Sequence, residues 1–273
     1  MHNELFSIGP ITIYGYGLMI GIGVLVCIFM GMYRAKKYGL KEDVVLDIAI
    51  YGLLFGWAGA KVLYVIVEWK AFMQDPLSVL GSEGFVVYGG ITAGVLAAIV
   101  YCKRKGHVFI EYFDILCASI AVAQGFGRIG CFLAGCCYGR ETTSPIGVVF
   151  PAGSIAPAGV KLLPTQLFSS AGDFGIMFAL LWHYKRRKHV GDTGYLYMLL
   201  YGIGRFLIEM LRNDDRGDVG SLSTSQFISI FIVAAAVLLL WNNKKRGRKV
   251  EAAISEDTKE QEPGQTANEE GMA

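Results

Sequence analysis

Charged residues are scarce in this chain. Asp, Glu, Lys and Arg make up 18% of its 273 residues, whereas soluble domains are usually nearer a quarter charged. The charges that are present lie in short clusters between long apolar stretches, which is typical of membrane proteins and argues against a soluble domain. The net charge of +2 indicates little about partners, and we expect no nucleic acid among them.

Histidine is rarer still. The chain has four, at positions 2, 107, 183 and 189, and none lies near the group of cysteines between positions 131 and 137. Tetrahedral zinc sites usually show two spaced pairs of ligands or nearby histidines, so we expect no metal. The N-terminus also lacks the basic segment and the cleavage site of a signal peptide, and we therefore expect no cleaved leader.

Long apolar runs are what the chain has in abundance. Seven of them extend over about residues 11–33, 44–67, 85–102, 112–133, 166–184, 193–211 and 226–241. About 20 helical residues cross the roughly 30 Å of hydrocarbon in a bilayer. Seven such runs together argue against buried helices of a soluble protein. The sequence therefore predicts an all-α membrane protein with seven transmembrane helices.

The loops between the runs predict an orientation. Sixteen lysines and arginines follow the first, third, fifth and seventh runs, within residues 34–41, 103–105, 185–188 and 244–249. The alternate loops hold five. Because cytoplasmic loops carry the excess of positive charge, the N-terminus is expected outside the cell and the C-terminus in the cytoplasm. We expect one transmembrane domain over residues 1–249 and a disordered polar tail over 250–273.

This orientation places the unusual residues of the runs in one layer, the outer leaflet. Arg128 lies near the outer end of the fourth run and Arg205 in the outer half of the sixth. Tyr16 and the segment Tyr88-Gly89-Gly90 fall near the same surface. An arginine at the centre of a membrane helix costs about 2.5–3.5 kcal/mol, so a cavity or an anionic partner is expected to receive it. Two arginines in one leaflet indicate a lipid phosphate.

Four polar residues in the sixth run and at its boundary are predicted to share one helical face. Tyr201, Arg205 and Glu209 are spaced four apart, and Arg212 follows three residues later. One interpretation is internal neutralisation, in which Glu209 pairs with the two arginines to make the helix insertable. That pairing leaves a net positive charge on the face, so an anion-binding site remains the competing interpretation.

Glycines and cysteines surround Arg128. Glycines at 127, 130, 135 and 139 allow either close helix packing or the close approach of a ligand. Cysteines at 131, 136 and 137 lie together, whereas those at 27, 102 and 117 are scattered and are expected to be small apolar side chains. A structural role, a disulfide and a nucleophile all stay open for the clustered three.

These stretches resemble the bacterial prolipoprotein diacylglyceryl transferases, and the resemblance extends from residues 8–10 to Gln226. Four motifs carry it: Tyr14-Gly15-Tyr16-Gly17-Leu18-Met19, Gly127-Arg128-Ile129-Gly130 with Phe132, Pro164-Thr165-Gln166-Leu167, and Tyr201-Gly202-Ile203-Gly204-Arg205 with Glu209 and Arg212.

The resemblance implies an activity and a site. The family transfers a diacylglyceryl group from phosphatidylglycerol to the lipobox cysteine of a lipoprotein precursor, in the bacterial plasma membrane and without a cofactor. Arg128 and Arg205 would hold the phosphate and Glu209 would orient them. Tyr16 and Tyr201 would donate hydrogen bonds to the lipid headgroup. The substrate-binding residues expected in addition are Arg212, Gly89 and Gly90.

The chain departs from the family pattern at three positions. The family carries histidine, a proposed base for the thiol, where this chain has Tyr88, and tyrosine, with an ordinary pKa near 10, is a poor base at neutral pH. Tyr88 is nevertheless our candidate for that catalytic position. Cys131 replaces the family's asparagine, and Cys136 replaces an acidic residue.

Three other functions compete with ordinary transfer. The first is a non-catalytic protein, or one of altered specificity, that binds anionic lipid or lipoprotein precursors. The second is a transferase in which Cys136 or Cys137 acts covalently. The third is a small transporter, which the absence of paired interrupted spans in repeated halves disfavours.

Overall fold

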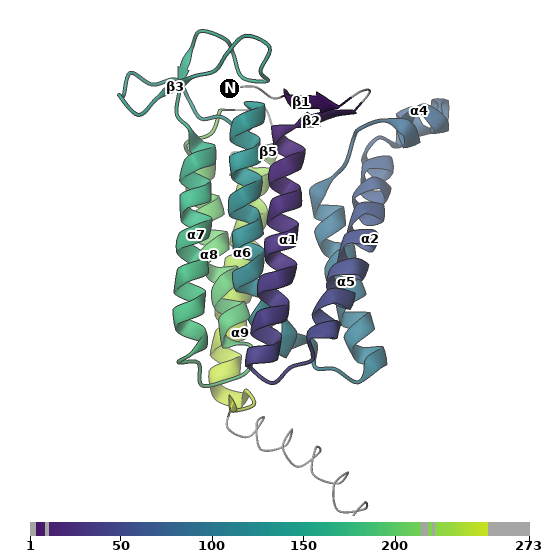
Figure 1. Ribbon diagram of the computed structural model, residues 1–273, viewed down its shortest axis with the longest axis vertical. Helices are drawn as coiled ribbons and strands as arrows, with labels where there is room; N and C mark the ends of the chain where they lie inside the picture. Colours follow the sequence, from purple (N-terminus) through teal and green to yellow (C-terminus); the bar gives the residue numbers. More distant parts are fainter. Residues whose placement is uncertain (1–3, 9–10, 214–217, 220–221, 251–273) are drawn as a thin grey trace, which may run out of the picture. The chain divides into compact units, whose positions relative to one another are not determined.

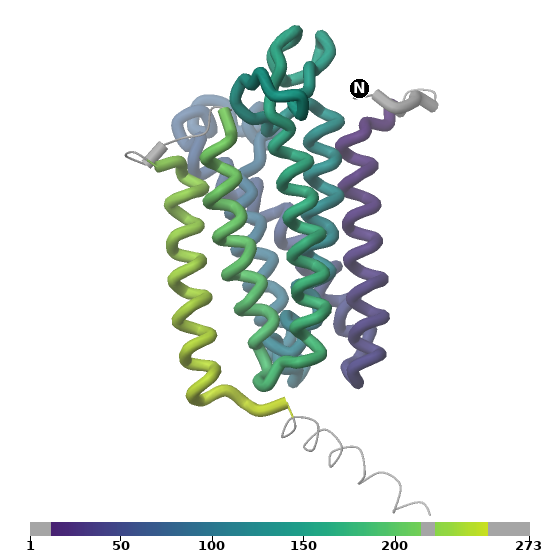
Figure 2. The backbone as a smooth tube through the Cα atoms, turned by 90° about the vertical axis from the view of Figure 1, so that its left-hand side faces the viewer, coloured from purple at the N-terminus to yellow at the C-terminus, as the bar shows by residue number. Residues whose placement is uncertain are grey.

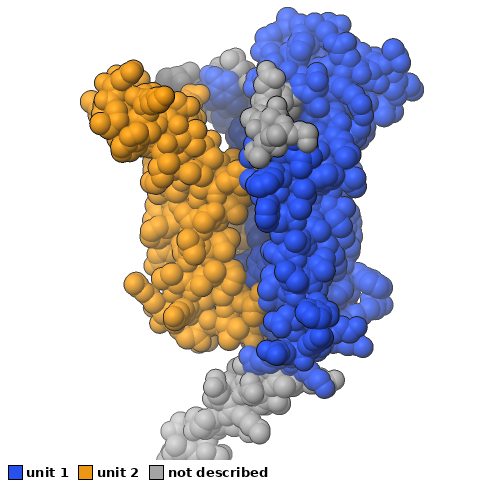
Figure 3. Space-filling model, turned by 180° about the vertical axis from the view of Figure 1, so that it is seen from behind, with its two compact units in different colours: residues 1–27, 113–273 blue, residues 28–112 orange. Residues whose placement is uncertain are grey.

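A computed structural model describes residues 4–8, 11–213, 218–219 and 222–250. The tail predicted to be disordered lies outside these residues except for its first position. The chain divides into two compact units, coloured separately in Figure 3. Unit 1 comprises Met1–Cys27 and Phe113–Ala273, and unit 2 comprises Ile28–Tyr112.

Long helices form the bulk of the described chain (Figure 1). Seven helices among the described residues have 18 residues or more: α1 (Gly15–Lys37), α2 (Glu42–Val67), α5 (Val87–Lys105), α6 (Phe109–Ala134), α7 (Thr165–Tyr184), α8 (Asp192–Glu209) and α9 (Thr224–Arg246). Each covers most of one predicted run. By length and composition, α1, α2, α6 and α9 are apolar enough to cross a membrane. The helical class is therefore confirmed, while the number of spans and their orientation stay predictions.

Short elements modify the all-α prediction. The shorter helices are α3 (Trp69–Gln74) and α4 (Pro76–Gly81). In the described part of the chain, three two-stranded antiparallel sheets pair β1 (Glu4–Ile8) with β2 (Ile11–Tyr14), β3 (Val148–Val149) with β4 (Lys161–Leu162), and β5 (Asp218–Val219) with β6 (Leu222–Ser223). The first apolar run thus begins as a strand and becomes helical at Gly15. Its first residues, Ile11, Thr12 and Ile13, are β-branched, which favours extended backbone.

In unit 1, helices that follow one another in the sequence run alongside one another (Figure 2). The Ser170 hydroxyl on α7 donates to the Gly125 carbonyl on α6 over 3.0 Å. On α8, a Cβ built at Gly202 would lie 2.8 Å from the Val233 side chain on α9. Because successive helices reverse direction, the C-terminal ends of α6 and α8 share one end of the unit with the N-terminal ends of α7 and α9 (Figure 1).

The segment between α6 and α7 folds back over that end of unit 1. Phe150 and Leu162 are almost fully buried and pack with Phe132 at the end of α6. The Arg140 amide donates to the Leu211 carbonyl over 3.0 Å, which pins the segment to the residues just after α8. The segment between α6 and α7 therefore covers this end of unit 1.

At the opposite end of unit 1, Asp114 joins two helices through its carboxylate. Its carboxylate is fully buried and accepts the amides of Gly191 and Gly194, each over 2.7 Å. Arg187 Nε lies 3.6 Å from the same group. A carboxylate that accepts amides at the N-terminus of a helix satisfies donors that have no partner within the helix and complements the helix dipole. Asp114 thus links α6 to the start of α8.

We expect Asp114→Ala to destabilise the protein by about 3 kcal/mol, because two buried amides lose their acceptor and Arg187 loses its counter-charge. The measurement is the midpoint of thermal unfolding in detergent. Glu141→Ala is the matched control in the same unit, since Glu141 is exposed and its loss should cost about 0.5 kcal/mol or less. Equal midpoints for the two variants would contradict the assignment.

Unit 2 is built on the close approach of α2 and α5. A Cβ at Gly90 would lie 2.9 Å from the Gly56 carbonyl oxygen, and one at Gly89 would clash with Gly59. The buried Lys61 ammonium donates to the carbonyl oxygens of Ser82, at 2.6 Å, and of Gly84, at 3.3 Å, and so fixes the segment that leads into α5. Helix packing therefore accounts for both Gly89 and Gly90.

Candidate functional site

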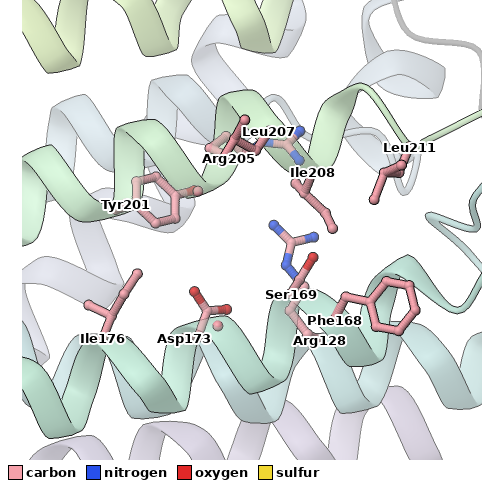
Figure 4. A pocket seen from close by; sticks show the side chains of 12 residues that line it. Arg128, Phe168, Ser169, Asp173, Ile176, Tyr201, Arg205, Leu207, Ile208 and Leu211 are labelled. Carbon is pink, nitrogen blue, oxygen red and sulfur yellow. The ribbon is translucent and has the colours of Figure 1, made fainter.

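A cavity of about 200 Å³ lies within unit 1 between α6, α7 and α8 (Figure 4). Most of the residues that line it are apolar, and three are charged: Arg128, Asp173 and Arg205. The residues that line it are Arg128 from α6; Phe168, Ser169, Gly172, Asp173 and Ile176 from α7; and Tyr201, Gly204, Arg205, Leu207, Ile208 and Leu211 from α8. The apolar side chains in this set keep the charged groups in low-dielectric surroundings, where their interactions are strengthened.

Arg128 and Arg205 line this one cavity although they come from different helices. Figure 4 shows the Arg128 guanidinium extending from α6 toward α8. The two guanidinium groups are close enough to repel each other electrostatically, and each attracts the Asp173 carboxylate. The convergence expected from the sequence is thus present in the structure. Two cations held together in an apolar setting favour an anion between them.

Of the two terminal nitrogens of Arg205, Nη2 is paired with neighbouring side chains, whereas Nη1 has no hydrogen bond to any described residue. Its Nη2 lies 2.9 Å from Glu209 Oε2 and donates to Ser225 Oγ over 2.8 Å. Its Nη1 is buried and has no hydrogen-bond partner within the described part of the chain. A buried N–H group normally finds an acceptor, so the guanidinium retains donor capacity for a ligand after pairing with Glu209.

Glu209 fixes the position of Arg205 rather than facing the cavity. Its Oε1 accepts the Ser223 hydroxyl over 3.2 Å, and its Oε2 lies 4.0 Å from Arg212 Nε. The Ser223 hydroxyl also accepts the Gln226 amide in a capping box that starts α9. Internal pairing at the end of α8 is therefore real, and it joins Glu209 to Arg205. The prediction that Arg212 shares the helical face is wrong, because α8 ends at Glu209 and Arg212 follows in the next segment.

Asp173 was missed in the sequence. It is 7% exposed, lies midway along α7 and lines the cavity. In Figure 4 its carboxylate points into the space between Tyr201 and Arg128. The available signal was an acidic residue inside the apolar run 166–184, because an ionisable group at membrane depth marks a functional site by default.

The remaining candidates differ in their relation to the cavity. Tyr201 lines it and stacks on Tyr197, with ring centroids 5.8 Å apart. Tyr16 on α1 does not line it, but its ring borders Gly130 and interacts electrostatically with Arg128. Arg212 reaches the site through Glu209.

Tyr88, Gly89 and Gly90 lie in the first turns of α5, which belongs to unit 2. Tyr88 is 36% exposed, and its backbone carbonyl oxygen accepts the Thr92 hydroxyl over 2.9 Å. Their participation in the site stays a prediction.

The fold and the cavity define a helical membrane protein that holds cationic groups and a carboxylate in an apolar interior. Residues 3–242 match the family described as prolipoprotein diacylglyceryl transferase. The chain belongs to this family.

Curated relatives align over nearly their whole length. The phosphatidylglycerol–prolipoprotein diacylglyceryl transferase 2 of Clostridium perfringens is 50% identical over 252 residues, which is 91% of this chain and 98% of the relative. The phosphatidylglycerol–prolipoprotein diacylglyceryl transferase of Clostridium tetani is 44% identical over 91% of this chain and 100% of the relative. The similarly named protein of Finegoldia magna is 36% identical over 90% and 97%. The resemblance inferred from the motifs is confirmed.

Proposed function

We propose that this chain transfers the diacylglyceryl group of phosphatidylglycerol to the lipobox cysteine thiol of lipoprotein precursors. The observation that carries the proposal is the pair Arg128 and Arg205 on one cavity with Asp173. The names of the relatives supply the two substrates. A carbon–sulfur bond forms, the carbon–oxygen bond to the phosphate breaks, and glycerol phosphate leaves.

The two arginines bind the phosphate and stabilise the charge that develops on the leaving group. Guanidinium groups offer planar pairs of donors that match phosphate oxygens. The Arg205 Nη1 donor, buried and without a hydrogen-bond partner among the residues that the structure describes, is available for such an oxygen. Donors held in a low-dielectric site are worth far more than in water, because they need no reorganisation when charge develops.

The thiol proton needs an acceptor, and Asp173 is the candidate that the cavity offers. Its carboxylate is buried beside the phosphate-binding arginines. Burial disfavours the charged form, which makes a carboxylate a stronger base. Tyr88 remains the candidate at the position where the family carries histidine, as a hydrogen-bond donor or proton relay.

The other polar residues position these groups. Glu209 holds Arg205 through their 2.9 Å ion pair and ties it to the start of α9 through Ser223. Tyr201 presents its ring to the cavity, and its hydroxyl is assigned to the glycerol of the headgroup. Tyr16 is assigned to the mouth of the site.

The topology belongs to the same proposal. The seven long helices span the bacterial plasma membrane, with the N-terminus outside and the C-terminus in the cytoplasm. The cavity then lies at outer-leaflet depth, where the lipid donor is present. Residues 1–249 form the membrane domain, and the polar residues after it form a cytoplasmic tail.

The direct test incubates the purified protein with phosphatidylglycerol vesicles and a lipoprotein-precursor peptide. Intact-mass spectrometry is expected to show one diacylglyceryl group on the lipobox cysteine. A precursor with serine in place of that cysteine should gain no mass. Binding of the normal precursor without any mass increase would instead support a non-catalytic lipid or lipoprotein binder.

A further inference from the structure

Three thiols converge where α6 ends, and none of them lines the cavity described above. The sulfur atoms of Cys131, Cys136 and Cys137 all lie within 4.8 Å of one another. None of the three forms a disulfide within the described residues, and all are partly buried. The proposed transfer uses none of them, and their spacing in the sequence does not resemble a metal motif.

The backbone brings these residues together where α6 ends. Gly135 and Cys137 both have left-handed backbone conformations, with φ of +73° and +63°. The Cys136 amide donates back to the Cys131 carbonyl over 3.1 Å. The chain therefore reverses direction, and the two later cysteines fold over the earlier one. A non-glycine residue with positive φ is uncommon and persists where its surroundings hold it.

Two side chains of α7 hold this turn in place. Gln166 Nε2 donates to the Cys136 carbonyl over 2.7 Å, and Thr165 Oγ1 donates to the Cys137 carbonyl over 2.8 Å. Gln166 and Thr165 are almost fully buried. The thiols are thus presented by a fixed backbone rather than by a free loop, which lowers the cost of collecting them around one ligand.

We propose that Cys131, Cys136 and Cys137 form a binding site for a zinc ion, with three thiolate ligands and an open fourth position. Zinc–sulfur bonds of about 2.3 Å in a tetrahedral site place sulfur atoms about 3.8 Å apart. The observed limit of 4.8 Å needs a contraction of only about 1 Å. Binding converts three thiols to thiolates and releases their three protons to solvent.

The surroundings suit the charge of such a site. A zinc ion with three thiolates carries one net negative charge, and Arg128 interacts electrostatically with Cys131. A disulfide would engage two of the sulfurs and leave the third without a role, and it would require an oxidant. A soft metal ion uses all three.

The test measures binding rather than transfer, so its outcome is separate from that of the proposed function. Purified full-length protein, reduced and freed of metal, is mixed with zinc chloride and passed through a desalting column. Elemental analysis is expected to find one zinc per chain. Alkylation with N-ethylmaleimide, mapped by mass spectrometry of peptides, should then show that zinc protects the three cysteines but not Cys27.

Variants locate the site. The triple variant Cys131→Ser, Cys136→Ser, Cys137→Ser is expected to lose the bound zinc, whereas Cys27→Ser should retain it. The alkylation map of the unaltered protein gives the answer even if the triple variant fails to fold. Zinc retained by a folded triple variant, no zinc on the reduced parent protein, or alkylation unchanged by zinc would each overturn the proposal.

Discussion

Replacing Arg128 with alanine is expected to slow diacylglyceryl transfer about 10²–10³-fold, the cost of removing one preorganised donor from a site of developing charge. Arg128 is the contribution of α6 to the cavity, and α6 supplies no carboxylate to neutralise it there. The measurement is the initial rate of mass gain on the precursor cysteine, at saturating phosphatidylglycerol. The loss should appear in kcat as well as in kcat/KM, because the interaction strengthens as the phosphate leaves.

Two controls separate the site from general charge. Arg140→Ala removes an exposed arginine of the same unit and should leave the rate unchanged. Arg128→Lys keeps the charge without the planar pair of donors, and an intermediate rate is expected. A normal rate in Arg128→Ala would remove the basis of the proposed function.

Exchanging Asp173 for asparagine is the second change with a large expected effect, a loss of about 10²–10⁴-fold in transfer rate if its carboxylate accepts the thiol proton. Asparagine has the same shape but is not a base. The readout is the same initial rate, together with retention of phosphatidylglycerol by the purified variant. Retained lipid with a lost rate would place the defect in proton transfer rather than in binding.

Variants of Tyr88 provide the comparison. Tyr88→Phe should lower the rate if the hydroxyl participates, and Tyr88→His should raise it if the site keeps the geometry of the family. Full activity of Asp173→Asn combined with inactivity of Tyr88→Phe would assign the proton relay to unit 2 and exclude Asp173.

The location of Arg128 and Arg205 at the same end of unit 1 was predictable, because it needs only the direction of each helix. Two runs that leave the membrane on the same side bring their C-terminal halves to the same depth, and the charge of the loops indicates the side. The face that joins Arg205 to Glu209 follows from helical spacing. Both predictions use regularities that hold along a whole helix, so errors of a residue or two at its ends do not affect them.

Asp173 and the thiol cluster could not be placed in this way. A single aspartate in an apolar run indicates that a polar partner or a cavity accommodates its carboxylate. It does not indicate which of the neighbouring helices provides that partner or cavity. The cysteines meet across a helix end, where two positive φ angles reverse the chain, and such angles are set by local tertiary contacts such as those of Gln166 and Thr165. The strand that begins the first run was likewise not predicted, since the periodicity of a continuous apolar run does not separate its first residues from the helix that follows.

Amino-acid order alone was enough to establish a helical membrane protein of this family, because hydrophobic length and motif spacing are properties of the chain itself. The assembly of the cavity, with Arg128, Asp173 and Arg205 all lining it, and the gathering of three sulfurs were decided only by tertiary packing. Both depend on side chains that come from different helices, or from the two sides of a helix end, and meet at one point in space. A local segment of the sequence does not determine contacts of that kind.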